Sequence, residues 1–320
     1  MVNDCNVAVI GGAGFLGSHL VDHLIADRHC KVLVLDNLIS GQKKHLHTLA
    51  KFLWHDIRSD ENELIRIFGK HDIEYVMNFA AEPYIPECFE RPMHFFEINA
   101  TAVLKVLNAV QKSPTVKRLL QVSSAEIYGD VTGKITEDSV VTPHSTYGVS
   151  KCAADGLVQV RFREANVQSL ALRQFNCIGP RESHEYIVPE LISRIHEIPE
   201  YGKGKIRIGN NSTRDFLYAG DQVKIAVELL EKGKCGEVYN LGSEECIKIH
   251  DLAHLIAKLM HREIELVQDK NLERPWEIWN LLSDNTKIWN IVGRRKLTPL
   301  SEALQKTIDY FYTNGCKWDY

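Results

Sequence analysis

Three glycines that follow a short apolar segment constrain the fold of this chain most strongly. Residues 7–10 form a predicted strand that runs into Gly11, Gly14 and Gly17, and a helical pattern continues over residues 18–26. The first glycine allows a tight turn, the second lets the backbone approach a pyrophosphate, and the third lets the helix pack closely on its strand. A phosphate would then meet the free N–H groups at the start of the helix. The stretch predicts a dinucleotide-binding turn.

An acidic residue ends the next predicted strand. Residues 31–35 are mainly apolar, and Asp36 follows them about twenty positions after the last glycine. A carboxylate at this place can bind a ribose 2′-OH and repels a 2′-phosphate. Lys43 and Lys44 lie several residues further on, so neither is adjacent to Asp36. We therefore predict NAD rather than NADP as the cofactor.

Composition and charge exclude several other classes of protein. The chain has 320 residues, of which 44% are hydrophobic and 25% charged, and its formal net charge is −4. A negative charge without long basic runs argues against nucleic acid as a partner, and the apolar runs have the length of strands, so no membrane segment is expected. The eight cysteines show no Cys-x-x-Cys pair. We expect reduced thiols, no metal site and a cytoplasmic protein.

Strands and helices alternate through the first half of the chain. Strands are expected at residues 7–10, 32–35, 75–79 and 118–122, and helices at residues 18–26, 61–68 and 95–111. This order predicts an α/β fold of the Rossmann type, a doubly wound parallel sheet that binds ligands beyond the carboxyl ends of its strands. We expect residues 1–175, together with about 216–245, to form this domain. Residues 176–215 and 246–320 are expected to form a smaller C-terminal substrate-binding lobe.

A tyrosine and a lysine four residues apart supply the candidate catalytic chemistry. Tyr147 and Lys151 would lie on one face of a helix, where the lysine charge and a nearby cationic nicotinamide ring would stabilise the Tyr147 phenolate, whose ordinary pKa is about 10. Tyr147 could then take a proton from a sugar hydroxyl held by Ser124, while a hydride leaves the same carbon for the cofactor. Tyr201 and Lys205 have the same spacing, but glycines interrupt that segment, so we do not expect them to act as a pair.

Taken together, these motifs resemble those of a known enzyme family. The chain is similar, essentially end to end, to the extended short-chain dehydrogenase/reductases of the NAD-dependent nucleotide-sugar epimerase/dehydratase family. The segments that carry the resemblance are residues 11–17, 36–41, 79–82, 123–130, 147–151, 173–181, 214–218 and 274–277. The resemblance implies a tightly bound NAD that is reduced and reoxidised within one turnover. It also implies a nucleoside-diphosphate sugar as substrate.

The resemblance and the loop positions together assign the site residues. Those assigned to the cofactor are Gly11, Gly14, Phe15, Leu16, Gly17, Asp36, Asn37, Ser40, Gly41, Asp56, Ile57, Ala80, Ala81, Tyr147 and Lys151. Those assigned to the substrate are Glu82, Ser124, Asn176, Arg214 and Arg274, of which the last three would hold the diphosphate. Two departures leave the identity of the substrate open. Position 276 is Trp where the family has a small residue, and the loop at 209–214 is slightly short.

The resemblance further implies a homodimer joined through helices near residues 100–111 and 151–164. Four apolar residues of the first helix recur at helical spacing, namely Val103, Leu104, Leu107 and Val110. They could form the seam of such a dimer, or they could pack only on the sheet of their own chain.

Glu126 decides which reaction is expected after oxidation at C4 of the sugar. Simple 4-epimerases that resemble this family carry a small residue there, whereas the dehydratases use a glutamate to remove the C5 proton before water leaves from C6. Ala125 stands where many dehydratases have an aspartate acid, so Glu126 would act first as base and then as acid. A 4,6-dehydratase is the leading expectation and a 4-epimerase the alternative. A sugar-acid decarboxylase or reductase is less favoured, and a non-catalytic NAD-binding protein is a remote alternative.

Overall fold

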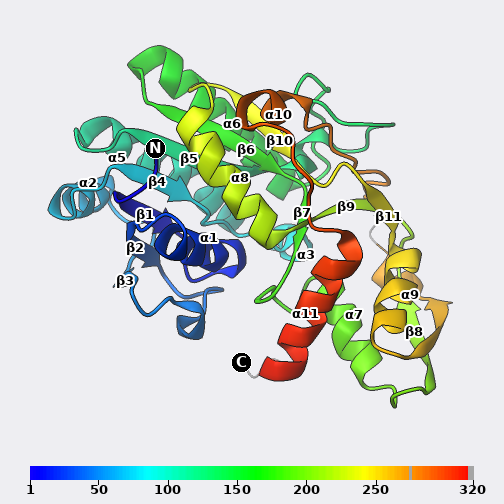
Figure 1. The fold of residues 1–320 in the computed structure, drawn as a ribbon. Helices are drawn as coiled ribbons and strands as arrows, with labels where there is room; N and C mark the ends of the chain where they lie inside the picture. Colours follow the sequence, from blue (N-terminus) through cyan, green and yellow to red (C-terminus); the bar gives the residue numbers. More distant parts are fainter. Residues whose placement is uncertain (274–275, 316–320) are drawn as a thin grey trace.

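The computed structural model describes residues 1–273 and 276–315. Its centre is a seven-stranded sheet in the order β10-β6-β5-β4-β1-β2-β3, and its strand pairs are all parallel (Figure 1). The strands are β1 (Asn6–Ile10), β2 (Lys31–Asp36), β3 (Lys51–Trp54), β4 (Tyr75–Asn78), β5 (Arg118–Ser124), β6 (Ser169–Gln174) and β10 (Val238–Leu241). The order reverses between β1 and β4, which is the place where sheets of this kind bind ligands. The doubly wound parallel sheet is thus confirmed.

Helices cover both faces of this sheet. One face carries α1 (Phe15–Ala26), α8 (Ala219–Lys232) and α10 (Thr286–Val292), and the other carries α2 (Glu61–Lys70), α5 (Ala102–Lys112) and α6 (Thr146–Ala165). Alternate side chains of a strand point to opposite faces. Val7 and Val9 of β1 accordingly pack into the first core, and Ala8 and Ile10 pack into the second.

Two elements of this domain differ from the sequence-based expectation. The helix expected at residues 95–111 forms as α4 (Pro92–Phe96), a π-helical turn η2 (Glu97–Thr101) and α5. Strand β3 was not expected, because it is a short edge strand whose residues are exposed or half-buried and so lack an apolar run. Other short elements of the domain are α3 (Ile85–Cys88), η1 (Lys43–His45) and η3 (Ala125–Tyr128).

The expected apolar seam on α5 is mostly core. Val103, Leu107 and Val110 are buried and pack on the sheet with α2 and α6, so these three side chains cannot contact a second copy of the chain. Leu104 alone of the four stays half-buried. The apolar spacing reflected packing within one chain, because an amphipathic helix presents the same stripe to its own sheet as it would to a partner.

A second, smaller group of elements has its own apolar core. It contains the helices α7 (Ile187–His196), α9 (Ile249–Leu259) and α11 (Leu300–Asn314). Its strands form a three-stranded sheet of β11 (Cys246–Lys248), β9 (Thr213–Tyr218) and β7 (Asn176–Ile178), and a two-stranded sheet of β12 (Glu263–Gln268) and β8 (Lys203–Ile208). A short turn, η4 (Lys270–Leu272), follows β12. In Figure 1 these elements lie beside the carboxyl ends of the parallel strands, with α11 alongside α7.

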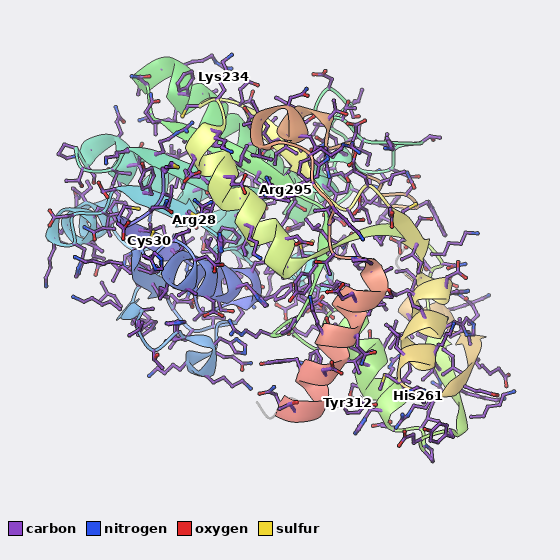
Figure 2. All side chains as sticks on the ribbon, viewed as in Figure 1. Arg28, Cys30, Lys234, His261, Arg295 and Tyr312 are labelled. Carbon is purple, nitrogen blue, oxygen red and sulfur yellow. The ribbon has the colours of Figure 1, made fainter. Side chains whose placement is uncertain are left out.

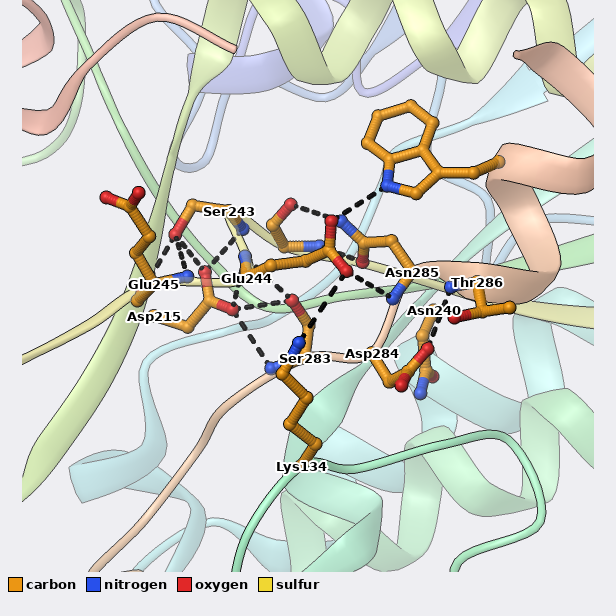
Figure 3. Close-up of polar contacts among 12 residues, drawn as sticks. Lys134, Asp215, Asn240, Ser243, Glu244, Glu245, Ser283, Asp284, Asn285 and Thr286 are labelled. Carbon is orange, nitrogen blue, oxygen red and sulfur yellow. Dashed lines mark hydrogen bonds and ion pairs between the residues drawn. The ribbon is translucent and has the colours of Figure 1, made fainter. Parts of the chain in front are cut away.

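A buried aspartate joins β9 to the large sheet. The Asp215 carboxylate accepts hydrogen bonds from the N–H and hydroxyl groups of Ser243 and of Ser283, at 2.5 to 3.0 Å, and from the Glu244 N–H at 3.2 Å (Figure 3). Ser243 and Glu244 follow β10, and Ser283 precedes α10. Burial raises the pKa of Asp215, and these hydrogen bonds oppose that effect. The cluster fixes β9 against the end of β10.

Charged contacts also fasten the segment that leads from α10 to α11. Arg295, which is labelled in Figure 2, forms two hydrogen bonds to the Glu228 carboxylate on α8, at 2.6 and 2.7 Å. A bidentate guanidinium–carboxylate pair has a fixed geometry. It therefore holds the start of the last helix in a defined position.

Candidate active site

A cavity of about 300 Å³ opens at the carboxyl ends of β1, β2, β4 and β5. Every residue that the sequence assigned to the cofactor lines it except Gly41, and so do the substrate candidates Glu82, Ser124 and Asn176. Glu126 lines it as well. The loops after the parallel strands therefore meet in one place, as the doubly wound topology requires.

The glycine turn has the shape of a phosphate cradle. A Cβ atom on Gly11, whose φ is +78°, would lie 2.6 Å from the Ala80 backbone nitrogen, and one on Gly17 would lie 2.0 Å from the Gly11 carbonyl oxygen. Gly11 and Gly17 are thus required by close backbone approach. Gly14 caps α1 without any side-chain hydrogen bond to the helix N-terminus. The N–H groups of the first turn can therefore receive an anion, and this arrangement fits a dinucleotide.

Asp36 lines the same cavity, next to the glycine turn. Its carboxylate is 8% exposed and accepts hydrogen bonds from the Ala13 N–H at 2.9 Å and from the Leu38 N–H at 2.8 Å. Burial raises the pKa of Asp36, and the two N–H donors oppose that effect. A Cβ atom on Gly41 would lie 2.7 Å from the Asp36 carboxylate, so this position has no room for a side chain. Gly41 itself does not line the cavity.

The Asp56 carboxylate, which follows β3, forms an ion pair with a neighbouring arginine. The Arg58 guanidinium pairs with this carboxylate at 2.6 Å and lowers its pKa, and the Asn37 amide donates to the same carboxylate at 3.1 Å. Because Arg58 is committed to Asp56, it does not supply a positive charge to Asp36.

The candidate base and its lysine lie one turn apart at the start of α6. The Ser145 hydroxyl caps this helix by accepting a hydrogen bond from the Gly148 N–H at 3.1 Å, which fixes Tyr147 in the first turn. Tyr147 shares a hydrogen bond with Ser124, at the end of β5, and Lys151 Nζ donates to the Val122 carbonyl oxygen at 3.3 Å. Burial raises the pKa of Tyr147 and lowers the pKa of Lys151 to about 8.

Glu126 adjoins this group of side chains. It lies in η3, its N–H donates to the Ser124 hydroxyl oxygen at 3.2 Å, and its charge raises the pKa of Tyr147. It also lines a second cavity of only about 20 Å³, together with His144 and Arg214. A carboxyl group therefore stands within the same site as the serine and the tyrosine.

The remaining substrate candidates occupy different surroundings. Glu82 is half-buried in the wall of the main cavity, 3.7 Å from His94. Arg214 lies on β9, lines the small cavity and not the main one, and pairs with the Glu277 carboxylate at 2.6 Å. It also donates to the Ile278 carbonyl oxygen at 2.7 Å. Arg274 lies outside the described residues.

Two residues of the site were missed in the sequence. Glu277 is the partner of Arg214 and stands in a segment that resembles the family, but a sequence does not show which arginine a carboxylate will meet. Glu182 is a buried residue of the main cavity that directly follows the family-like segment 173–181. Its position just beyond a loop motif was the one available signal.

Comparison with known proteins identifies the family. The model of the NAD-dependent epimerase/dehydratase family matches residues 7–242. The chain belongs to this family. Its cofactor is NAD, which the fit of the glycine cradle and Asp36 supports independently.

Similar proteins include both dehydratases and epimerases. A dTDP-D-glucose 4,6-dehydratase of Homo sapiens is 30% identical over 325 residues, which cover 98% of this chain and 91% of that protein. The structure of a Thermotoga maritima UDP-glucose 4-epimerase with UDP-glucose has a TM-score of 0.88 at 28% identity, covering 97% of this chain and 99% of the other. The structure of a Bacillus anthracis dTDP-glucose 4,6-dehydratase with NAD has a TM-score of 0.86 at 26% identity, covering 98% of each chain.

Two features are absent from the part of the chain that the structure describes. None of the helices within residues 1–273 and 276–315 has both the length and the apolar character needed to cross a membrane. In the same part of the chain, no group of three or more His, Cys, Asp or Glu side chains is arranged to hold a metal ion.

Proposed function

We propose that this family member is an NAD-dependent nucleoside-diphosphate-sugar 4,6-dehydratase. The observation that carries the proposal is the placement of Glu126 beside Ser124 and Tyr147 at one cavity. A 4-epimerase needs no further acid or base next to these two residues, whereas an elimination across C5 and C6 does. The human protein similar to this chain over nearly its whole length is named as a 4,6-dehydratase.

In this proposal each side chain has one task in the first step. Bound NAD supplies a nicotinamide that can accept a hydride and later return it. Ser124 holds the C4 hydroxyl of the sugar by a hydrogen bond, and Tyr147 takes the proton from that hydroxyl. Lys151 holds its positive charge within the same buried site and so stabilises the phenolate form of Tyr147.

Glu126 would carry the second step. Once C4 is a ketone, the C5 proton is acidic and the Glu126 carboxylate removes it. The resulting carboxylic acid then gives that proton to the hydroxyl that leaves C6 as water, so C5 would take a different proton when the nicotinamide returns its hydride to C6. Ala125 offers no acid of its own, so a single residue would serve as base and then as acid.

Asn176 and Arg214, with Arg274, would hold the diphosphate of the substrate. Asn176 is in the main cavity, and Arg214 is at the adjoining small one. Arg214 is paired with Glu277, so a diphosphate at Arg214 would also face a carboxylate.

A 4-epimerase is the second candidate. Two observations favour it. Ala125 stands where many dehydratases carry an aspartate beside the glutamate, and the similar Thermotoga maritima structure is that of a 4-epimerase. In that case Ser124, Tyr147 and Lys151 would suffice, and Glu126 would have no chemical step.

We also propose that the chain forms a homodimer, through a surface other than the buried stripe of α5. Exposed apolar side chains lie on α4 and at the start of α6, where Met93 is 71%, Phe96 38% and Val149 45% exposed. The two helices contact each other, so these residues lie on neighbouring elements. A second copy would remove them from water.

A panel of UDP-, dTDP-, GDP- and CDP-sugars tests the proposed reaction. Products would be followed by mass and proton NMR. We expect one substrate to give a product lighter by one water. A product of unchanged mass with inverted C4 would identify a 4-epimerase. A protein that binds NAD but converts no sugar in the panel would favour the non-catalytic alternative.

A further inference from the structure

Glu182 is a buried residue whose carboxyl group makes fewer hydrogen bonds than it can. It lies between β7 and α7, is 4% exposed and lines the main cavity. Its Oε2 atom is buried and has no hydrogen-bond partner among the described residues. The Gly179 backbone provides a hydrogen bond to this carboxyl group. An unpartnered oxygen of this kind costs free energy, which a ligand in the cavity could recover.

A second buried acceptor, at the start of β7, also has no hydrogen-bond partner among the described residues. The Oδ1 atom of Asn176 is buried without a partner, and Asn176 also lines the cavity. The intervening Cys177 donates its thiol proton to the Phe175 carbonyl oxygen and so does not reach either atom. This wall of the cavity therefore presents unsatisfied oxygen atoms, and such a wall suits a ligand that donates hydrogen bonds.

The surroundings of Glu182 do not favour a phosphate as its ligand. The adjacent Arg181 forms an ion pair with Asp22 at 2.7 Å, so its charge is compensated by a carboxylate other than Glu182. Burial raises the pKa of Glu182 well above its usual range, and the Gly179 backbone is the influence that opposes it. Burial raises the pKa values of Cys177 and Tyr186, both of which line the cavity, and Glu182 adds to this effect. The same burial that disfavours the charged form of Glu182 also disfavours an anion at this place.

We propose that Glu182 is a binding residue that accepts a hydrogen bond from an uncharged N–H or O–H group of the ligand. Two sources of such a group fit the cavity: the carboxamide or a ribose hydroxyl of NAD, and a hydroxyl of the nucleotide sugar. This proposal depends on the proposed function in one respect, namely that the cavity binds a nucleotide sugar as well as NAD. It concerns binding and not the chemical step.

Binding measurements with matched variants test this assignment. Glu182→Met keeps the length of the side chain and removes its oxygen atoms, whereas Glu182→Gln keeps an acceptor in the same place. Glu190→Gln removes a carboxylate from the surface of α7, where Glu190 pairs with Arg194, and serves as the control. Isothermal titration would give Kd for NAD with cofactor-free protein. It would also give Kd for the nucleotide sugar, or for the nucleoside diphosphate without its sugar, with NAD-loaded protein.

We expect Glu182→Met to weaken one of these affinities by about tenfold, and Glu182→Gln to restore most of it. A loss confined to NAD places the donor on the cofactor, and a loss confined to the sugar-bearing ligand places it on the substrate sugar. Unchanged affinities in Glu182→Met for all three ligands would overturn the proposal and leave Glu182 a structural residue. Glu182→Ala, which adds no apolar atoms, is measured as well if Glu182→Met melts at a lower temperature than the wild type. Because no turnover is measured, a failed dehydratase assay leaves this result intact.

Discussion

Lys151 Nζ lies 5.9 Å from the centroid of the Tyr147 ring, one turn along α6. The ammonium group donates instead to the Val122 carbonyl oxygen. Both side chains are buried, at 3% and 7% exposure. A charge at this distance acts more strongly in a buried site than in water, so Lys151 can favour the phenolate of Tyr147 without a direct hydrogen bond.

Tyr147→Phe tests the assignment of the base. The change removes the hydroxyl and little volume, so we expect turnover to fall by at least about a thousandfold while NAD binding and the melting temperature change little. Tyr201→Phe is the matched control, because Tyr201 has the same spacing to a lysine but is 80% exposed. Full activity in Tyr147→Phe would show that another group takes the proton.

Lys151 predicts a change of activity with pH. Because burial lowers its pKa to about 8, its charge is present below pH 8 and is lost as the pH rises through that value. We expect kcat to fall on the alkaline side of pH 8 for this reason. Lys151→Met should be inactive at every pH and should bind NAD more weakly, since a lysine here would contact the nicotinamide ribose. A wild-type kcat that keeps rising to pH 10 would contradict the assignment.

The same lowered pKa has a consequence for stability. Between pH 8 and 10.5 the unfolded chain holds a proton at Lys151 that the folded chain does not, so this residue makes the folded state more stable as the pH rises through that window. At neutral pH the buried charge is unfavourable, and Lys151→Met should raise the melting temperature by about 2–6 °C. Thermal melts of both proteins from pH 6 to 10 would measure this difference, which should shrink toward pH 10.

The sequence predicted the parts of the site that local rules determine. Gly11 and Gly17 follow from close backbone approach, Asp36 from the end of a strand, and Tyr147 with Lys151 from helical spacing. All of these lie where the parallel topology brings loops together, so the main cavity could be inferred. The sequence could not show which side chains of distant segments would pair with each other. Arg214 meets Glu277, 63 positions away, and this contact depends on how the second lobe folds.

Burial was the other property that the sequence could not supply. Glu182 follows a loop motif and looks like an ordinary surface acid, yet it is enclosed by the cavity wall. The stripe on α5 was ambiguous for the same reason, because Val103, Leu107 and Val110 would look the same at a dimer seam as in the core. Strand β3 was missed because its residues are exposed or half-buried at the edge of the sheet.

The surroundings of Asp36 predict that the protein binds NAD more tightly than NADP. The Asp36 carboxylate is fixed by two backbone N–H groups, and Arg58 is held by Asp56, so a 2′-phosphate would be repelled without compensation. We expect NADP to bind at least about tenfold more weakly than NAD, and Asp36→Asn to narrow this gap. Titrations of cofactor-free protein with both nucleotides give the ratio. Equal or tighter binding of NADP to the wild type would reject the prediction.

The exposed apolar residues of α4 and α6 indicate which substitutions should dissociate the proposed homodimer. Met93→Glu combined with Val149→Glu places charges where a second copy would bury apolar side chains, and we expect a dimer to dissociate at micromolar concentration. Light scattering would show the change in mass. Leu49→Glu is the control, because Leu49 is 77% exposed and precedes β3 at the far edge of the sheet. A wild-type protein that is already monomeric would refute the dimer.

Glu126→Gln separates the leading reaction from the alternative. The amide keeps the size and hydrogen-bonding reach of Glu126 but cannot remove a proton. In a 4,6-dehydratase, oxidation at C4 would still proceed while elimination stalls, so absorbance of the reduced nicotinamide should accumulate and turnover should fall by at least about a hundredfold. Glu87→Gln, a change in a surface pair with Arg91, is the control and should behave as the wild type.

The products of the wild-type enzyme complete this test. A 4,6-dehydratase gives a product lighter by one water, and in heavy water that product carries deuterium at C5, because the original C5 proton leaves with the water and C5 takes its new proton from an exchangeable source. A 4-epimerase gives a product of the substrate's mass without solvent deuterium, because Tyr147 exchanges protons only with the C4 hydroxyl. It would also keep most of its activity in Glu126→Gln. An unchanged mass with inverted C4 would therefore reject the dehydratase and leave Glu126 without a chemical role.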